Sequence, residues 1–198
     1  MSADDRQRWN ARYRDGNHAT TTPSELLTSA AYLLPASGRA LDLAGGAGRH
    51  ASWLARRGMR VTLADVSDVG LEIASRRAMG EGVPLEVLQV DLEESPPPAG
   101  PWDLIVLFHY LHRPLFADMP ILLAPGGVLF FVQPTVKNLE RHSKPSRSYL
   151  LEEGEAPRLV EGLEILCYQE GWLAEGRHEA LLIARNARPT KNSVAGSP

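Results

Sequence analysis

Short runs of apolar residues recur along the middle of the chain, and stretches with helical spacing separate most of them. The expected strands cover residues 40–44, 60–64, 85–90, 104–108 and 128–132. The expected helices cover residues 50–57, 69–79 and 114–123. Strands that are apolar on both faces and alternate with helices indicate parallel βαβ units with helices covering the sheet. Because such crossovers are right-handed, the sequence predicts an α/β fold with a doubly wound, mostly parallel sheet.

The beginning of the chain predicts two further helices, both within residues 3–34. Residues 3–14 have helical spacing, with Trp9 and Tyr13 four positions apart on one face. A second helix is expected to begin at Pro23-Ser24-Glu25 and to stop before Pro35.

The end of the chain has a different pattern. Residues 164–168 and 179–184 predict two short strands, and the glycines between them favour an antiparallel pair that closes the sheet. The sequence after Arg185 is polar and contains Gly, Ser and Pro, which is typical of a disordered tail. We therefore predict a single domain over residues 1–185 and a disordered tail over residues 186–198.

Composition narrows the class of protein. A chain of 198 residues with 43% apolar and 23% charged residues is typical of one soluble globular domain. The net charge of −3 gives no electrostatic case for a nucleic-acid or membrane partner, and we interpret Arg56, Arg57 and Arg60 as a solvated helix face. Cys167 is the only cysteine, which excludes an intrachain disulfide framework and a thiolate metal cluster. We find no signal-peptide pattern and no apolar run of membrane-spanning length, so we expect a cytoplasmic protein.

Residues 41–50 carry the most informative pattern of the chain. A predicted strand runs into a turn that contains Gly45, Gly46 and Gly48, and this turn opens a helix. Glycine lets a ligand approach the backbone closely, and a helix start presents free N–H groups. Asp65 ends the next strand, 17 residues after Gly48, where a carboxylate can bind both hydroxyls of a ribose. The pattern predicts a nucleoside site; the alternative is a tight turn without a ligand and an aspartate that caps a helix.

Two kinds of nucleotide ligand fit this loop. The spacing Gly46-x-Gly48-x-x-Ala51 also matches the fingerprint of a dinucleotide site. However, Asp42 lies just before the loop, where a carboxylate would repel a pyrophosphate and attract a cationic sulfonium and amino group. Asp91 adds a second acid after the third strand, and little chain remains for the second substrate-binding region of a dehydrogenase. We therefore favour a cationic nucleoside over a nicotinamide cofactor.

The same stretch resembles the first motif of the class I S-adenosylmethionine-dependent methyltransferases, an acid–x–Gly–x–Gly–x–Gly loop. Its four positions are occupied by Asp42, Ala44, Gly46 and Gly48. Over residues 3–185 the resemblance continues through Asp65, Val90-Asp91-Leu92, Trp102-Asp103-Leu104-Ile105-Val106 and Leu123-Ala124-Pro125-Gly126-Gly127. Similarity to the small bacterial branch related to tellurite-resistance methyltransferases is carried by Trp9 with Tyr13, Phe108-His109-Tyr110-Leu111-His112-Arg113-Pro114 and Lys144-Pro145-Ser146.

This resemblance implies a Rossmann-like fold, S-adenosylmethionine as the cofactor, and methyl transfer. It assigns the methionine part to Asp42 and the loop backbone, the ribose to Asp65, and the adenine to Asp91 and Leu92. The complete set of cofactor-binding residues that it implies is Asp42, Ala44, Gly45, Gly46, Gly48, Asp65, Val66, Asp91, Leu92 and Phe108. Ala44 departs from the usual glycine; it would cost about 1 kcal/mol or more if the position required a positive φ, and nothing if φ stays negative.

Candidate catalytic residues follow the fourth predicted strand. Methyl transfer is a direct displacement, to which in-line placement can contribute up to ~7–11 kcal/mol. A base is needed only when the acceptor carries a proton that must leave. Histidine titrates near neutrality, so His109, Tyr110 and His112 are the candidates for a base or an orienting group; packing at a strand end is the alternative. We expect no metal here, because no carboxylate or cysteine lies at ligand spacing.

Residues 133–149 follow the fifth predicted strand without any periodicity. A loop of this length in a compact domain is usually disordered or functional. Its place at the carboxyl edge of the sheet favours a lid that binds the acceptor over a plain surface loop. The candidate acceptor contacts are Gln133, Arg141, His142, Arg147 and Tyr149.

The sequence therefore predicts an S-adenosylmethionine-dependent methyltransferase. Enzymes that methylate amino groups of nucleic acids carry (Asn/Asp)-Pro-Pro-(Tyr/Phe) after the fourth strand, where this chain has His109-Tyr110-Leu111-His112. A small-molecule acceptor is the better prediction, with xenobiotics, thiols and metalloid oxyanions as options, and the oligomeric state stays open. The main alternative is an S-adenosylmethionine-binding sensor or assembly partner without turnover; a nicotinamide-dependent oxidoreductase is less favoured.

Overall fold

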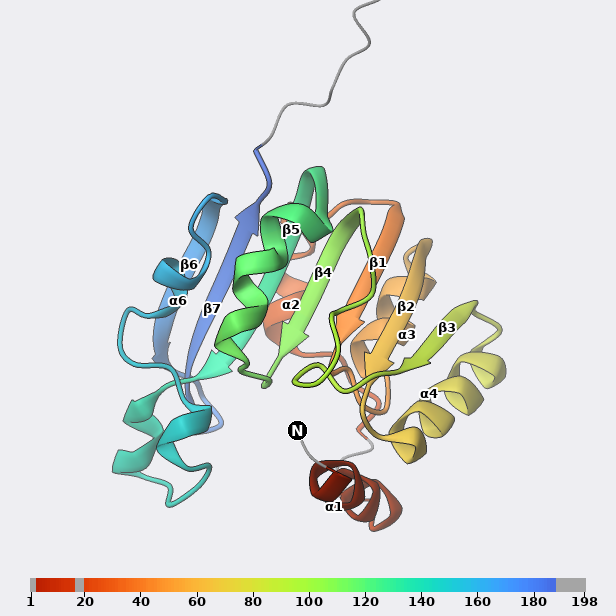
Figure 1. Ribbon diagram of the computed structural model, residues 1–198, viewed down its shortest axis with the longest axis horizontal. Helices are drawn as coiled ribbons and strands as arrows, with labels where there is room; N and C mark the ends of the chain where they lie inside the picture. The colour runs from red at the N-terminus through yellow and green to blue at the C-terminus, as the bar shows by residue number, and fades with distance from the viewer. Residues whose placement is uncertain (1–2, 17–19, 188–198) are drawn as a thin grey trace, which may run out of the picture.

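The strands form one seven-stranded sheet in the order β3-β2-β1-β4-β5-β7-β6 (Figure 1). The computed structural model describes residues 3–16 and 20–187. The strands are β1 (Gly38–Leu43), β2 (Met59–Asp65), β3 (Leu85–Gln89), β4 (Trp102–Phe108), β5 (Leu123–Pro134), β6 (Glu164–Trp172) and β7 (His178–Arg185). Neighbouring strands from β3 to β5 are parallel, whereas β7 is antiparallel to both β5 and β6. The predicted α/β fold with an antiparallel C-terminal pair is confirmed.

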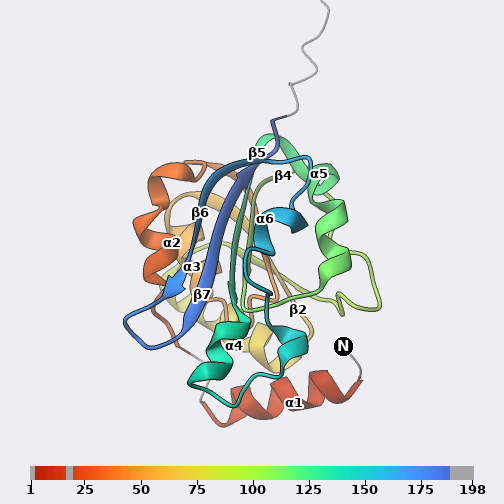
Figure 2. The same cartoon turned by 90° about the vertical axis from the view of Figure 1, so that its left-hand side faces the viewer.

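Helices cover both faces of the sheet (Figure 2). The α-helices are α1 (Ala3–Arg14), α2 (Glu25–Ser29), α3 (Arg49–Arg56), α4 (Asp68–Glu81), α5 (Met119–Leu122) and α6 (Ala156–Leu159). The 3₁₀ helices are η1 (Ala31–Leu33), η2 (Arg113–Asp118), η3 (Val136–Glu140) and η4 (Arg147–Tyr149). Residues of α2, α3 and α4 pack on one face, and those of η2, α5 and α6 pack on the other. Helix α1 instead lies across the carboxyl ends of the central strands (Figure 1).

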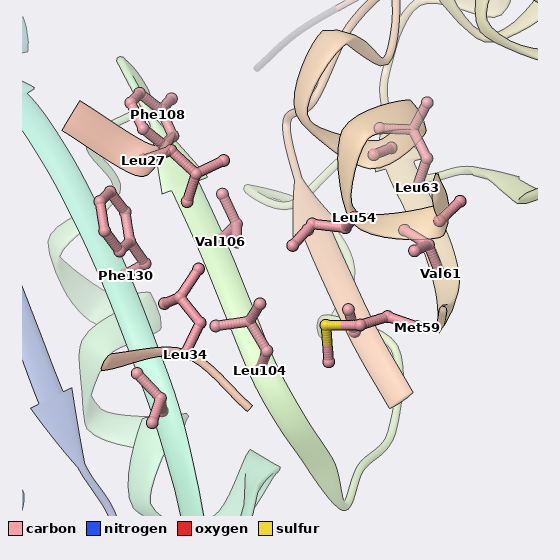
Figure 3. Packing of buried hydrophobic residues seen from close by; sticks show 14 of the residues in the cluster. Leu27, Leu34, Leu54, Met59, Val61, Leu63, Leu104, Val106, Phe108 and Phe130 are labelled. Atoms are coloured by element: carbon pink, nitrogen blue, oxygen red, sulfur yellow. The ribbon is translucent and has the colours of Figure 1, made fainter. Parts of the chain in front are cut away.

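The core is divided by the sheet because alternate residues of a strand point to opposite faces. Leu104, Val106 and Phe108 of β4 face α2 and α3, where Phe108 stacks on Phe130 of β5 with ring centroids 5.5 Å apart (Figure 3). The intervening Ile105 and Leu107 pack against η2 and α5. Burial on both faces explains why residues 104–108 of β4 and residues 128–132 of β5 are continuous apolar runs.

Several predicted elements are shorter or less regular than expected. The helix predicted up to residue 34 consists of α2 and η1, and the helix predicted over 114–123 consists of η2 and α5. Pro114 and Pro120 stand at the starts of η2 and α5. Proline lacks an N–H and cannot continue a helix that precedes it, which explains the break between η2 and α5. The predicted loop over 133–149 contains η3 and η4.

The described chain continues just beyond β7. Asn186 is buried, and its side-chain amide donates hydrogen bonds to the carbonyl oxygens of Pro120 and Leu123. The predicted tail begins at this residue, and residues 188–198 of it lie outside the described residues. Within residues 3–16 and 20–187, every helix is too short or too polar to cross a membrane.

Candidate functional site

A cavity of about 310 Å³ opens at the carboxyl ends of β1, β2 and β4. In the strand order, β1 lies between β2 and β4, so the chain winds away from β1 in both directions. This reversal is the place where doubly wound sheets bind ligands. We call this space the switch-point cavity, and its lining is Trp9, Tyr13, Thr20, Ala44, Gly45, Ala47, Gly48, Arg49, His50, Asp65, Val66, Phe108, His109, Tyr110 and Arg177.

The glycine loop between β1 and α3 forms the floor of the cavity. Gly46 and Gly48 have φ values of 56° and 74°, and Ala44 has a φ of 52°. Glycine adopts this left-handed region freely, whereas alanine there costs about 1–2 kcal/mol. The sequence left open whether Ala44 would have a positive φ, and the structure shows that it does. The loop therefore holds backbone strain beside the cavity.

Helix α1 covers this loop. The hydroxyl of Tyr13 lies so close to Gly46 that a Cβ on this glycine would fall 1.8 Å from the Tyr13 oxygen. The helix is anchored by Asn10, which accepts a 2.6 Å hydrogen bond from the Ser67 hydroxyl and donates a 2.8 Å bond to Asp68. Because Asn10 and Ser67 are buried, this contact fixes α1 against the start of α4. Trp9 and Tyr13 are thereby placed over the cavity.

Asp65 at the end of β2 ties the loop to the next helix. Its Oδ2 accepts a 2.8 Å hydrogen bond from the backbone N–H of Gly46, and its Oδ1 accepts one of 2.8 Å from Ser67. Burial raises the pKa of Asp65 above its ordinary value, although the backbone hydrogen bonds oppose this shift. Each carboxylate oxygen can accept more than one hydrogen bond, so both oxygens retain capacity for a ligand hydroxyl.

Asp42 lies beneath the loop and outside the cavity lining. It is 1% exposed, and its Oδ2 accepts a 3.1 Å hydrogen bond from Ala51 N–H. Its Oδ1 is buried without a hydrogen-bond partner among the described residues. Desolvation by burial, with a smaller contribution from the charge of Asp65, raises the pKa of Asp42 to about 7. This carboxyl group would gain most from a cation bound at the loop, because a buried unpaired carboxylate is costly.

His109 occupies a strained position directly after β4. Its φ is 56°, and its N–H donates a 2.9 Å hydrogen bond to the Val132 carbonyl of β5. Its Nε2 lies 2.9 Å from Oε1 of Glu179 on β7, and Nε of Arg177 lies 3.2 Å from the same oxygen. Burial would raise the pKa of Glu179, but the contact with His109 and the charges of His109, Arg177 and Arg49 outweigh it, so the pKa lies below its ordinary value. Glu179 is therefore a buried, ionised carboxylate.

A second histidine, His50 at the start of α3, faces the same cavity. Its ring packs on Phe108 with a centroid distance of 4.0 Å, and only 3% of the residue is exposed. Burial, with smaller contributions from the charges of Arg49 and His109, lowers the pKa of His50 to about 2. His50 is therefore neutral, and its buried Nε2 has no hydrogen-bond partner in the described part of the chain.

The structure brings most predicted cofactor residues together. The predicted residues that line the cavity are Ala44, Gly45, Gly48, Asp65, Val66, Phe108, His109 and Tyr110. Gly46 lies under Tyr13, whereas Asp91 and Leu92 lie outside the lining. Leu92 instead packs in the core on the other face of the sheet, and Asp91 caps a turn by accepting a hydrogen bond from the N–H of Glu93. His112 immediately precedes η2 and also lies outside the lining.

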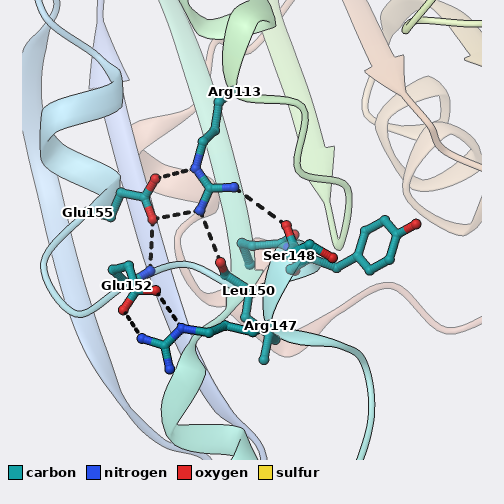
Figure 4. Close-up of polar contacts among 8 residues, drawn as sticks. Arg113, Arg147, Ser148, Leu150, Glu152 and Glu155 are labelled. Carbon is teal, nitrogen blue, oxygen red and sulfur yellow. Dashed lines mark hydrogen bonds and ion pairs between the residues drawn. The ribbon is translucent and has the colours of Figure 1, made fainter.

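The predicted acceptor loop lies away from the cavity. None of Gln133, Arg141, His142, Arg147 and Tyr149 is among the described lining residues. Gln133 donates a 2.6 Å hydrogen bond to the Tyr149 carbonyl, and Arg147 pairs with Glu152 (Figure 4). Arg141 stacks on Trp172 at 3.7 Å, and His142 Nε2 lies 2.9 Å from the Gly176 carbonyl oxygen.

An arginine holds the end of this loop against η2. Arg113 contacts both carboxylate oxygens of Glu155, at 2.5 and 2.9 Å, and donates hydrogen bonds to the carbonyl oxygens of Ser148 and Leu150 (Figure 4). Glu155 in turn accepts a hydrogen bond from the Glu152 N–H. The end of the loop is therefore held by hydrogen bonds and ion pairs that involve Arg113, Glu152 and Glu155.

Several lining residues had no predicted role. They are Trp9, Tyr13, Thr20, Ala47, Arg49, His50 and Arg177, to which Glu179 is added through His109. One signal was available in the sequence, because Glu179 stands next to the apolar run Ala180-Leu181-Leu182-Ile183-Ala184. A charged residue in such a strand is almost never fully buried unless it has a partner. The described residues contain no group of three or more side chains that could hold a metal ion.

Gly45→Ala is expected to lower the free energy of unfolding by about 1–3 kcal/mol. A Cβ at this position would lie 2.2 Å from Leu63 Cδ1 and 2.6 Å from Asp42 Cγ, so buried groups would have to move. The matched control is Gly80→Ala in α4, where a Cβ would have nothing within 4 Å. That change should raise stability by about 0.5–1 kcal/mol. Urea unfolding of both variants tests this; equal stability of the two would contradict the packing described.

The part of the chain that forms most of the switch-point cavity also matches a known protein family. Residues 40–127 match the family model described as a methyltransferase domain. These residues include the glycine loop, Asp65 and His109. No curated protein matches the sequence.

Three solved structures with the same fold are 15–21% identical in sequence to this chain. TehB from Haemophilus influenzae has a TM-score of 0.70 and 21% identity over 88% of this chain, which spans 66% of the TehB chain, just under two thirds. An S-adenosylmethionine-dependent methyltransferase from Aquifex aeolicus has a TM-score of 0.63 and 15% identity, covering 93% of this chain and 98% of that one. The [4+2]-cyclase SpnF has a TM-score of 0.66 and 19% identity, covering 81% and 79%. These likenesses show the fold, and they confirm the predicted resemblance at that level.

Proposed function

We propose that this chain is an S-adenosylmethionine-dependent methyltransferase that acts on a small-molecule acceptor. The proposal is supported by the match of residues 40–127 to a methyltransferase-domain model and by the fold shared with solved S-adenosylmethionine-dependent methyltransferases. The cofactor of this class is S-adenosylmethionine, which supplies a methyl group already activated by a positively charged sulfur. The observation that carries the proposal is the switch-point cavity, where the glycine loop and Asp65 meet His109.

The residues at the cavity fit this cofactor. The buried Oδ1 of Asp42 has no partner among the described residues, and an ionised Asp42 beside a cationic group would be stabilised. Asp65 would accept the ribose hydroxyls, and Val66 and Phe108 would supply apolar walls. The volume of about 310 Å³ is within the range of small-ligand sites. Asp91 and Leu92 would reach the adenine only if the segment after β3 moved toward the cavity.

A small acceptor is supported by the size and lining of the cavity. Trp9 and Tyr13 of α1 line this partly open space together with His109 and Arg177. The net charge of −3 gives no general attraction for a nucleic acid. We place the acceptor beside His109 and Tyr110, and we assign His112 no part in the reaction.

A melting screen followed by a transfer assay tests this proposal. S-adenosylhomocysteine at a hundredfold excess over its dissociation constant should stabilise the protein by about 2.7 kcal/mol, whereas NADH should have no effect. Incubation with labelled methyl donor and a metabolite extract should then give a labelled small product. Stabilisation by NADH alone would overturn the proposal. Binding without any product would favour the alternative without methyl transfer, and the fold also occurs in a protein described as a [4+2]-cyclase.

A further inference from the structure

We propose that Glu179 positions His109 as a general base, so that the acceptor is one that must lose a proton, such as an alcohol or a phenol. This inference rests on the proposed methyl transfer and names the acceptor class of the same site. Its basis is the 2.9 Å contact between His109 Nε2 and Glu179 Oε1 at the edge of the switch-point cavity.

Glu179 is a buried carboxylate near the start of β7. It is 4% exposed, and both His109 and Arg177 lie beside its Oε1. Burying an ionised carboxylate is costly unless charged or hydrogen-bonding groups compensate it. The two groups beside this carboxylate, His109 and Arg177, both line the cavity, which points to a role for the charge at the cavity.

The His109 ring nitrogen beside Glu179 lies at an ion-pair distance of 2.9 Å, without the alignment of a hydrogen bond. An ionised carboxylate oxygen has only lone pairs, so the ring nitrogen this close to it carries the proton. With the proton on Nε2, the neutral ring has its free lone pair on Nδ1, and Nδ1 has no polar partner among the described residues. His109 lines the cavity and its side chain is 30% exposed. The ring can therefore take a proton from a bound acceptor and pass it to solvent.

The backbone of His109 has a positive φ. Among the described residues, the only other non-glycine residue with a positive φ is Ala44 in the glycine loop. Such a conformation costs of order 1–3 kcal/mol, and it persists where surrounding contacts enforce it. The hydrogen bond from His109 N–H to the Val132 carbonyl is such a contact. With this backbone conformation, the ring contacts Glu179 and lines the cavity.

In the proposed transfer, the acceptor oxygen uses a lone pair to form a bond with the methyl carbon. The bond between the sulfur and this carbon breaks, and the sulfur keeps its electron pair. The acceptor proton passes to Nδ1 of His109, and the resulting imidazolium is stabilised by the carboxylate of Glu179. A thiolate acceptor carries no such proton and makes no use of the base.

A matched pair of acceptors tests the inference in the intact protein. The probes are 4-methylphenol and 4-methylbenzenethiol, which differ in the reacting atom and in whether it is already ionised at mildly alkaline pH. Glu179→Gln should lower kcat for the phenol by about 100-fold and leave kcat for the thiol within about 3-fold. His109→Asn should also lower kcat for the phenol, by about 100-fold more than it lowers kcat for the thiol, and asparagine tolerates the positive φ. Transfer to the thiol but not to the phenol by the wild type, or equal losses for both, would overturn the inference.

Two further measurements separate this inference from the proposed function. Glu175→Gln is the matched control, because exposed Glu175 contacts the same Arg177 at 3.3 Å and should change neither rate. Nitrogen-15 NMR of the histidine rings in the free protein should show His109 with its proton on Nε2, and a proton on Nδ1 would contradict the assignment whatever the acceptor is. If neither probe is methylated, the NMR result alone decides the role of Glu179, and the assay with the metabolite extract decides methyl transfer.

Discussion

Asp65→Asn is expected to abolish the thermal stabilisation that S-adenosylhomocysteine gives the wild-type protein. The carboxylate is proposed to bind two ribose hydroxyls, and each charge-assisted hydrogen bond is worth about 1.5–3 kcal/mol. Losing both corresponds to a dissociation constant roughly 100-fold higher or more. The amide also places a donor beside the N–H of Gly46 or of Ser67, which now donate to Asp65 at 2.8 Å. The site should therefore lose the ribose contacts of Asp65 and one of the hydrogen bonds by which Asp65 holds Gly46 and Ser67.

The control for Asp65 is Asp103→Asn at the opposite end of the sheet. Asp103 is also an aspartate of a parallel strand, and its Oδ2 accepts a 2.7 Å hydrogen bond from the N–H of Arg39. This variant should lose some stability, yet S-adenosylhomocysteine should still raise its melting temperature by the wild-type amount. Isothermal titration measures the affinity of both variants. Wild-type affinity in Asp65→Asn would refute the ribose contact.

The sheet could be predicted because its strands are buried on both faces. Burial of β4 and of the middle of β5 on both faces favours continuous apolar runs, and such runs are visible in a single sequence. The glycine loop and Asp65 could be predicted for a related reason, since a close backbone approach and a strand-end carboxylate have local signatures. These features depend on residues near one another in the chain.

The remaining parts of the site depend on contacts across the fold. Tyr13 reaches Gly46 only because Asn10 anchors α1 on Ser67, and Glu179 reaches His109 only because β7 inserts beside β5. Pairing of distant segments leaves no periodicity that a sequence pattern can reveal.

The predicted acceptor lid shows the limit of an argument from position alone. Residues 133–149 do follow β5 at the carboxyl edge of the sheet, but the side chain of Gln133 donates to the Tyr149 carbonyl within the loop itself. The Arg113 network then holds the end of the loop against η2, outside the switch-point cavity. Its position after β5 places the loop at the carboxyl edge of the sheet, yet none of its candidate side chains is among the described residues that line the cavity.

Asp42→Asn is expected to stabilise the free protein at pH 8 and to change the pH dependence of its unfolding. The pKa of Asp42 is raised from 3.8 to about 7, chiefly by burial. A raised pKa in the folded state means that the associated stability is fully present below pH 3.8 and is lost as the pH rises through 7. The loss amounts to about 4 kcal/mol, at 1.36 kcal/mol for each pH unit of the shift. An asparagine avoids this loss but buries an amide, which costs about 1–3 kcal/mol.

The net result should be a variant about 1–3 kcal/mol more stable than the wild type at pH 8 and no more stable than it at pH 4. Urea unfolding of both proteins at pH 4, 6 and 8 measures this. His50 changes the free energy of unfolding in the opposite direction. Because burial lowers its pKa to about 2, the folded protein loses stability as the pH falls below 6.5. Because His50 is present in both proteins, the difference between the two profiles isolates Asp42. If the two pH profiles were parallel, Asp42 would not be protonated in the folded protein at neutral pH. Its carboxylate would then gain no special stabilisation from a bound cation.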